Sequence, residues 1–387
     1  MAETPDAYIG REQTMVKHAV LRTYLSRFAP IVLSYWDSIV YVDCFSGPWN
    51  AHTNDLSDTS FAVALDELRK AKDVQQSKGR AIELRCFFLE KDKQAYAKLK
   101  AFAESVPDVS IETRNGTLEE SVSAIVDFVH KEGTKTFPFI FIDPTGWTGF
   151  AMDTIAPLLR LEPCEVLINL MTKDIRRFIE SPEDQTQASF DRLFGRTGIR
   201  EGVAGRQGLD RDDYVVDEYR ASVAETGDYD YVCATVVLHP ERDRTHFHLV
   251  YATRHRRGVE AFKDAEKNAM AAQESARADA HNRRRQAATG MSSLFAEHET
   301  PDSSYYTHLR EHYLSRSRSL VRRLLEQRRR VPYEEIWDVA MAQPLTWESD
   351  LKDWIRQWQK DGLLSHQGWQ PRQKVPRLDE GNILVWL

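Results

Sequence analysis

The sequence predicts an α/β fold built on a mostly parallel sheet, and three observations support this class. Short apolar runs bounded by turn residues recur along the first part of the 387-residue chain. Segments with helical spacing of apolar residues lie between these runs. Strands that alternate with helices need crossover connections, so their sheet is mostly parallel and covered on both faces. Two later apolar runs, separated by the polar turn "ERDR", predict a terminal antiparallel hairpin at the sheet edge.

The predicted elements follow one another in a recognisable order. Residues 14–36 carry apolar side chains at helical spacing and predict an amphipathic helix that leads into the sheet. Five parallel strands are predicted next, and then the hairpin; the seven segments are 38–45, 83–90, 109–115, 137–143, 165–171, 231–240 and 245–255. Five parallel strands and a terminal hairpin follow the element order of class I methyltransferases. We therefore expect a Rossmann-like, methyltransferase-type domain over residues 1–254.

The composition changes after this domain. Residues 255–304 form a charged segment and a linker: high helix propensity with little apolar patterning predicts an exposed or bridging helix, and Gly, Ser and Pro follow it. Residues 305–387 contain three helix-like segments and a hairpin-like end, which predicts a winged-helix-like domain. Arginines cluster there in "SRSRSLVRRLLEQRRR". That cluster suits a nucleic acid backbone or a solvated helix face, and the same module also serves in protein contacts.

The composition is that of a globular chain without a membrane span. Hydrophobic residues make up 42%, charged residues 29%, and the formal net charge is −7. Mean hydropathy is −0.52, and no apolar run approaches the roughly 18 residues of a span. The N-terminus shows no secretory signal, so we expect a cytoplasmic protein. The four cysteines form no C-x-x-C pair and lie beside apolar runs, so we expect buried, reduced thiols.

Candidate cofactor-binding residues lie where predicted strands end, because ligands of such sheets bind at the carboxyl ends of the strands. Asp43 ends the first strand before a turn that contains Phe45 and Gly47. The carboxylate could bind an amino acid ammonium while the glycine lets the backbone approach a ligand; a helix cap and a plain turn explain the same letters. Glu90 ends the second strand and could accept hydrogen bonds from both hydroxyls of a ribose, or cap the next helix. Asn115 follows the third strand, where an adenine would lie, although Asn-Gly is also a common turn.

Candidate catalytic residues follow the fourth strand. Asp143 ends a continuous apolar run, and Pro144 then fixes the chain so that the acid turns outward. Trp147 comes next, between two glycines. In enzymes that methylate an exocyclic amine, a short loop of this kind accepts hydrogen bonds from the amine while an aromatic ring stacks on the base. A non-catalytic Asp-Pro turn is the alternative.

Further polar residues follow the fifth strand and could bind a phosphate or a carboxylate: Asn169, Lys173 and either Arg176 or Arg177. The histidines do not cluster at metal-ligand spacing. His246 and His248 alternate on one strand without a third ligand, so we expect structural roles for them and no metal site.

Taken together, several motifs resemble those of the three-Cys-motif partner protein family: "VKHAVLRTYL", "YVDCFSGPW", "FIDPTGW", "VLINLM…IRRF" and "FHLVYATRHRRGVEAFKDA". The resemblance spans roughly residues 10 to 270. It implies a methyltransferase-like Rossmann fold and a partner protein that carries three cysteines and resembles iron–sulfur or radical S-adenosylmethionine proteins. Asp43 and Gly47 match the family's first-strand motif, and Asp143, Pro144 and Gly146 match its fourth-strand motif. Relatives commonly read Gly-Pro-Gly where this chain has Trp49 in place of the second glycine.

Two functional hypotheses follow. The first is an S-adenosylmethionine-dependent, methyltransferase-like enzyme that acts on nucleic acid held by the basic C-terminal domain. The second is a catalytically degenerate Rossmann scaffold that binds DNA or the three-Cys partner protein in a defence or mobile-element system. A metal-dependent nuclease using Asp143 and Glu90 is disfavoured, because no lysine motif accompanies these acids.

Overall fold

The chain divides into two compact units, which are described separately. The computed structural model describes residues 4–47, 51–53, 55–131, 135–289 and 304–387. The main division between the units falls between residues 301 and 302.

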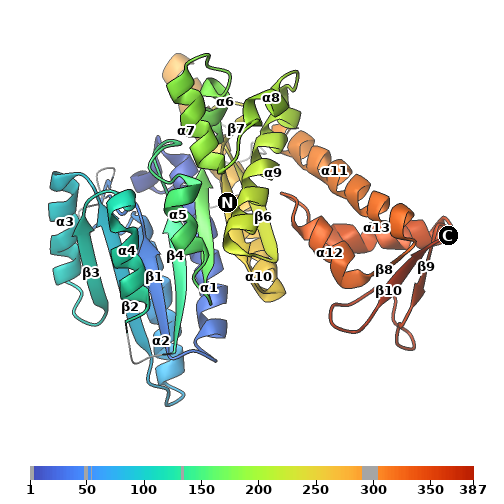
Figure 1. Cartoon of the computed structure of the whole chain (residues 1–387), viewed down its shortest axis with the longest axis horizontal. Coiled ribbons are helices and arrows are strands. Elements are labelled where there is room, and N and C mark those ends of the chain that lie inside the picture. Colours follow the sequence, from blue (N-terminus) through green and yellow to red (C-terminus); the bar gives the residue numbers. More distant parts are fainter. Residues whose placement is uncertain (1–3, 48–50, 54, 132–134, 290–303) are drawn as a thin grey trace. The chain divides into compact units, whose positions relative to one another are not determined.

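The first unit contains a seven-stranded sheet whose spatial order is β3-β2-β1-β4-β5-β7-β6 (Figure 1). Strands β1 to β5 pair in parallel, and β7 runs antiparallel to β5. The predicted mostly parallel sheet with its antiparallel terminal strands is therefore confirmed. The strands are β1 (Ser38–Asp43), β2 (Glu83–Glu90), β3 (Ser110–Asn115), β4 (Thr136–Ile142), β5 (Glu165–Leu170), β6 (Tyr231–Leu238) and β7 (Thr245–Thr253).

Every residue of β1 and β5 is buried, which explains why these strands read as continuous apolar runs instead of alternating ones. Parallel crossovers are right-handed, and the chain moves in opposite directions along the sheet from β1 to β3 and from β4 to β5. The helices α2 and α3 therefore cover one face and α5 covers the other.

The helices of this unit are α1 (Glu12–Val32), α2 (Ser60–Gln76), α3 (Lys93–Glu104), α4 (Leu118–Val129), α5 (Met152–Leu159), α6 (Thr172–Phe178), α7 (Asp184–Phe194), α8 (Ile199–Val203), α9 (Gly208–Gly227) and α10 (Arg256–Thr289), preceded by the short 3-10 helix η1 (Asp6–Tyr8). Helices α6 to α9 lie between β5 and β6, a stretch for which the sequence pattern predicted no elements.

The helix α10 packs along α1, so the expectation of an exposed or bridging helix was wrong. Arg27 pairs with Asp264 at 3.6 Å, and Arg283 pairs with Glu12, so the two helices run antiparallel. The buried side chains of α10 are alanines with Val259, Phe262 and Met270, and four polar residues are buried among them: Lys263, Glu266, Gln273 and Arg277. Alanine contributes little to a hydrophobic pattern, and for this reason the spacing of apolar residues did not indicate the buried face of α10.

The second unit combines three helices with a three-stranded sheet. Its elements are α11 (Ser304–Arg328), β8 (Arg330–Pro332), α12 (Tyr333–Met341), α13 (Glu348–Lys360), β9 (Leu364–Gln367) and β10 (Ile383–Trp386). The strands are antiparallel in the order β8-β10-β9. Leu351, Ile355 and Trp358 of α13 are buried, and Trp354, which helical spacing places on the same face, is half-buried.

Two sequence expectations concern the chain as a whole. All four cysteines are buried free thiols, as predicted. None of the described helices is long and apolar enough to cross a membrane.

Candidate functional site at the carboxyl ends of the strands

The sheet brings three predicted acids to one edge. Asp43 ends the central strand β1 and lies opposite Phe88 of β2 on one side and Phe141 of β4 on the other. Glu90 and Asp143 each lie two residues beyond those partners. Because neighbouring parallel strands lie about 5 Å apart, the three carboxyl groups share the carboxyl edge of the sheet.

Asp43 is fully buried and held by hydrogen bonds. Its Oδ1 accepts from the backbone N–H of Phe45 at 3.1 Å, and its Oδ2 accepts from the hydroxyl of Ser60 at 2.6 Å. Burial raises the pKa of Asp43 to about 6; the hydrogen bond from Ser60 opposes this rise, and the charge of Asp143 adds to it. The carboxyl group is therefore poised to change its charge near neutral pH, and its surroundings favour a cationic ligand that would stabilise the ionised form.

The turn after β1 is fastened to the sheet by a serine that the sequence analysis did not single out. The hydroxyl of Ser46 donates to the carbonyl of Asp43 at 2.7 Å, and its N–H donates to a backbone carbonyl of β2 at 2.8 Å. The N–H of Gly47 donates to the carbonyl of Phe45 at 2.9 Å. Trp49, which replaces the second glycine of the related motif, lies outside the described residues, so its effect on a ligand stays a prediction.

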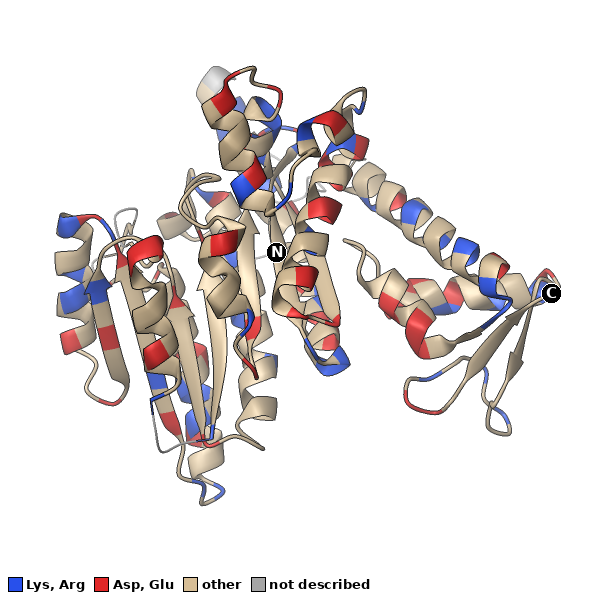
Figure 2. Ribbon diagram, in the orientation of Figure 1, with Lys and Arg blue, Asp and Glu red and all other residues tan. Residues whose placement is uncertain are grey.

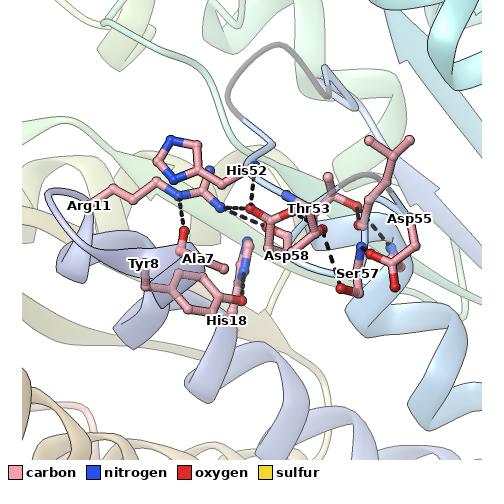
Figure 3. A network of polar contacts seen from close by, with 12 residues as sticks. Ala7, Tyr8, Arg11, His18, His52, Thr53, Asp55, Ser57 and Asp58 are labelled. Carbon is pink, nitrogen blue, oxygen red and sulfur yellow. Dashed lines mark hydrogen bonds and ion pairs between the residues drawn. The ribbon is translucent and has the colours of Figure 1, made fainter. Parts of the chain in front are cut away.

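Asp58 anchors the far side of the same loop, at the centre of the network in Figure 3. It pairs with Arg11, and it accepts from the N–H of His52 at 2.8 Å and from the hydroxyl of Thr53 at 2.6 Å. Burial alone would raise the pKa of Asp58, but these hydrogen bonds and the charge of Arg11 outweigh it and lower the pKa. The loop that carries Gly47 is thus tied to the chain just before α1.

Glu90 lies at the carboxyl end of β2. It is 7% exposed, and its Oε1 accepts from the N–H of Asp92 at 2.6 Å. Asp92, and not Glu90, caps the following helix α3. Burial raises the pKa of Glu90.

Asn115 lies beside Glu90 at the end of β3. Its amide donates to the carbonyl of Glu90 at 2.8 Å and to that of Lys91 at 3.1 Å. The side chain thus fixes the end of β2 relative to β3. A contact between Asn115 and an adenine remains a prediction.

Asp143 is held from two sides by residues distant in the sequence. Lys17 of α1 forms an ion pair with its Oδ2, and the amide of Asn169 donates to its Oδ1 at 2.7 Å. The Oδ1 of Asn169 is buried without a hydrogen-bond partner among the described residues. The sequence analysis missed Lys17, because a lysine within an amphipathic helix gives no sign of its burial.

Trp147 lies in an aromatic cluster. Its ring centroid is 4.8 Å from that of Phe178 and 5.5 Å from that of Phe190, and its indole N–H donates to Ser189 at 3.0 Å. The neighbouring Pro144 is buried. These contacts fix the loop that follows β4.

The polar residues beyond β5 separate into two groups. Arg176 pairs with the buried Asp212 and so fastens α6 to α9. Lys173 instead lies near the strand ends and donates to His246 Nε2 at 3.3 Å. Burial, helped by the charge of Lys173, lowers the pKa of His246 to about 3, so this imidazole is neutral and acts as a hydrogen-bond acceptor. Arg177 is exposed, with its guanidinium 4.8 Å from the ring centroid of Phe178.

The strand order, with one antiparallel strand beside five parallel ones, defines a Rossmann-like methyltransferase fold. No family model matches the sequence, and no curated protein matches it. One solved structure that aligns is a Legionella pneumophila protein of the family DUF519, with 8% identity over 61% of this chain and 85% of that chain and a TM-score of 0.36. Another is a loganic acid methyltransferase with SAH, with 11% identity over 60% and 78% of the two chains and a TM-score of 0.29. The fold assignment depends on the strand order and not on similarities of this size.

Proposed function

We propose that the first unit binds S-adenosylmethionine and directs methyl transfer to an exocyclic amine of a nucleic acid base. The observation that carries this proposal is the convergence of Asp43, Glu90 and Asp143 at the carboxyl ends of β1, β2 and β4. Ligands of doubly wound sheets bind at this edge, near the point where the strand order reverses. In this sheet that point lies between β1 and β4.

The chemistry of the available side chains fits the cofactor. Asp43 would pair with the ammonium of the methionine moiety, and Gly47 would let the backbone approach it. Glu90 would accept hydrogen bonds from the ribose hydroxyls, and Asn115 would border the adenine. When bound, the cofactor would supply an electrophilic methyl group.

On the acceptor side, Asp143 would accept a hydrogen bond from the target amine and take up its proton. Lys17 and Asn169 would hold this carboxylate in position, which is the requirement for an oriented proton acceptor. A base that stacked on Trp147 would have to share the indole with two phenylalanines. We therefore assign the direct contact to Asp143 and the placement of the loop to Pro144 and Trp147.

The degenerate scaffold is the second candidate, and one observation favours it. Both oxygens of Asp143 already have partners, one in Lys17 and the other in Asn169. Such a carboxylate can serve as a structural link between α1 and the sheet. A scaffold of this kind would bind DNA, or the three-Cys partner protein that the sequence resemblance implies.

We assign the second unit to the winged-helix class. The supporting observation is its order of elements, with one helix, a short strand, two helices and two further strands that join the first in one sheet. Modules of this class commonly bind nucleic acid. In the proposed enzyme this unit would hold the nucleic acid that carries the target amine.

Calorimetric titration with S-adenosylmethionine tests the proposal. We expect the wild type to bind, Glu90→Ala to abolish binding, and Glu83→Ala, an exposed acid at the opposite end of β2, to leave it unchanged. If the wild type releases no heat while Trp49→Gly does, the enzyme proposal is overturned and the degenerate scaffold is supported. Binding that survives Glu90→Ala would refute the assignment of the ribose site.

A further inference from the structure

The strongest concentration of positive charge in the second unit lies on α11 and its junction with β8. Residues 304–330 contain eight arginines and only two acidic residues, Glu311 and Glu326. Figure 2 shows basic positions at intervals along α11 and at its end. Among the described residues, Arg310 pairs with Asp350 and Arg328 pairs with Glu335, but no such pair accounts for Arg318, Arg323 and Arg330.

Three of these arginines form what we call the arginine stripe: Arg318, Arg322 and Arg329. The guanidinium of Arg318 lies 5.6 Å from the ring centroid of Trp358, and that of Arg322 lies 5.6 Å from that of Trp386. Residues four positions apart share one side of a helix, so Arg318 and Arg322 lie on one flank of α11. Arg329 follows directly after α11 ends, with a φ of +60°. Its Nη1 donates to the carbonyl of Leu387 at 3.0 Å. The stripe therefore begins on one flank of α11 and ends just beyond the helix.

The aromatic contacts orient the stripe without neutralising it. Trp358 and Trp386 meet edge to face, with centroids 5.6 Å apart, and so give the guanidinium groups of Arg318 and Arg322 a rigid support. A cation over an aromatic ring keeps its full charge and its hydrogen-bond donors. Arg318 makes no ion pair with the described residues, and the exposed pair between Arg322 and Glu326 contributes little in water.

Two more exposed arginines, Arg323 and Arg330, also lack an ion pair within the described part of the chain. They add to the local positive potential on either side of the stripe's last members. Guanidinium groups that are held in place, most of them without an ion pair within the described part of the chain, are suited to a row of phosphates, because each fork can donate two parallel hydrogen bonds to phosphate oxygens.

The charges of α13 are balanced instead. Lys352 pairs with Glu348 at 2.9 Å, and Arg356 pairs with Asp353 at 2.9 Å. In a winged helix this third helix would be the one expected to enter a groove and read bases. Its balanced charge gives it little attraction for a polyanion, so α11 is the better candidate for the main electrostatic contact.

We propose that the arginine stripe binds the phosphodiester backbone of nucleic acid without reading its sequence. In the proposed function this surface would hold the nucleic acid that accepts the methyl group. The proposal rests on that function for the reason why nucleic acid is bound, and the binding itself can be tested without it. Phosphate contacts of this type position a nucleic acid and carry no sequence information directly. DNA and RNA share this backbone chemistry.

The experiment measures the fluorescence anisotropy of labelled duplex DNA and duplex RNA of one sequence with the full chain, without S-adenosylmethionine, from 50 to 200 mM salt. Each arginine that neutralises a phosphate contributes about 0.9 to the slope of log K against log salt. The triple variant Arg318→Gln, Arg322→Gln and Arg329→Gln should therefore reduce the magnitude of this negative slope by roughly 2 to 3. It should also weaken binding about tenfold or more at the lower salt concentrations.

The matched control removes three exposed positive charges from the first unit by Lys78→Gln, Lys93→Gln and Lys98→Gln. It should leave the slope close to that of the wild type. An equal loss in both triple variants would show that only net charge matters and would overturn the proposal. If neither duplex binds, the proposal is overturned as well. The same holds if the stripe binds an acidic protein and neither duplex.

A second variant separates charge from geometry. Replacing all three residues of the stripe by lysine keeps the charge but removes the forked donors, so the salt slope should persist while the affinity falls. Calorimetry with S-adenosylmethionine on the glutamine variant checks that the first unit is intact. If the cofactor fails to bind while the duplexes bind through the stripe, the proposed function fails and this proposal stands.

Discussion

Replacing Asp43 by asparagine should change how stability depends on pH. The pKa of this buried carboxyl group rises from 3.8 to about 6 on folding. A group with a raised folded pKa stabilises the protein fully below its unfolded pKa, and that contribution is lost as the pH rises through the folded pKa. At about 1.4 kcal/mol per pKa unit, the ionisation of Asp43 should cost the wild type about 2.4 kcal/mol between pH 4 and pH 7.

Asparagine has nearly the same shape and cannot ionise. Its single carbonyl oxygen cannot satisfy both Phe45 and Ser60, so near pH 4 the variant should be less stable than the wild type by about 1 kcal/mol. As the pH rises, the wild type should lose its advantage, and by pH 7 the variant should be the more stable of the two.

Urea unfolding followed by pulse proteolysis, at several pH values from 4.5 to 7.5, resolves the first unit from the second by its fragments. The quantity of interest is the difference in free energy of unfolding between variant and wild type. Asp127→Asn, which removes an exposed carboxyl group from α4, is the control and should show a constant difference. A constant difference for Asp43→Asn would refute the reasoning, because the carboxyl group would then titrate alike in the folded and unfolded chain.

Three further predictions concern the first unit. Ionised Asp43 would hold the cofactor's ammonium, and a group with a pKa near 6 is about ten times more ionised at pH 7 than at pH 5. The affinity for S-adenosylmethionine, measured by calorimetry, should therefore be about tenfold weaker at pH 5 than at pH 7. Equal affinities would exclude this contact. Tyr24→Phe removes a hydroxyl donor from the buried carboxyl group of Glu165, so urea unfolding should show a loss of about 1 to 3 kcal/mol, and an unchanged free energy of unfolding would contradict it. Gly195→Ala, at a φ of +64°, places a methyl group 2.9 Å from a methionine side chain, whereas Gly79→Ala, at a φ of +81°, meets nothing within 4 Å. Thermal unfolding should show the first variant less stable than the second by about 1 to 3 kcal/mol. Equal losses would show that the methionine side chain moves away at no cost.

The strands and their terminal acids could be predicted because both are local features. A continuous apolar run that ends in a bare carboxylate is legible within a few residues, and Asp43, Glu90 and Asp143 each have this context. The register that brings them to one edge follows from parallel pairing alone.

The partners of these acids could not be predicted in the same way. Lys17 meets Asp143 across 126 positions of sequence, and no local pattern records such a pair. In the sequence Trp147 resembles a free stacking surface, but in the structure Phe178 and Phe190 pack against it. Both phenylalanines come from helices without a clear sequence signal. Side chains that hold a site in place depend on tertiary contacts, and these contacts are the part of a fold that periodicity leaves open.

The antiparallel pairing of α1 with α10 bears on how the first unit is made. Thr4 contacts Asp279, and Arg283 contacts Glu12. The helix α1 can therefore pack against α10 only after more than 250 further residues have been synthesised. Until then, part of the apolar surface of α1 has no cover, and closing so long a loop makes folding slow. A chain that stopped at residue 254 would keep the complete sheet and yet lack this cover. It should collect in aggregates or on chaperones during synthesis, while a chain that continues through α10 should fold once that helix emerges.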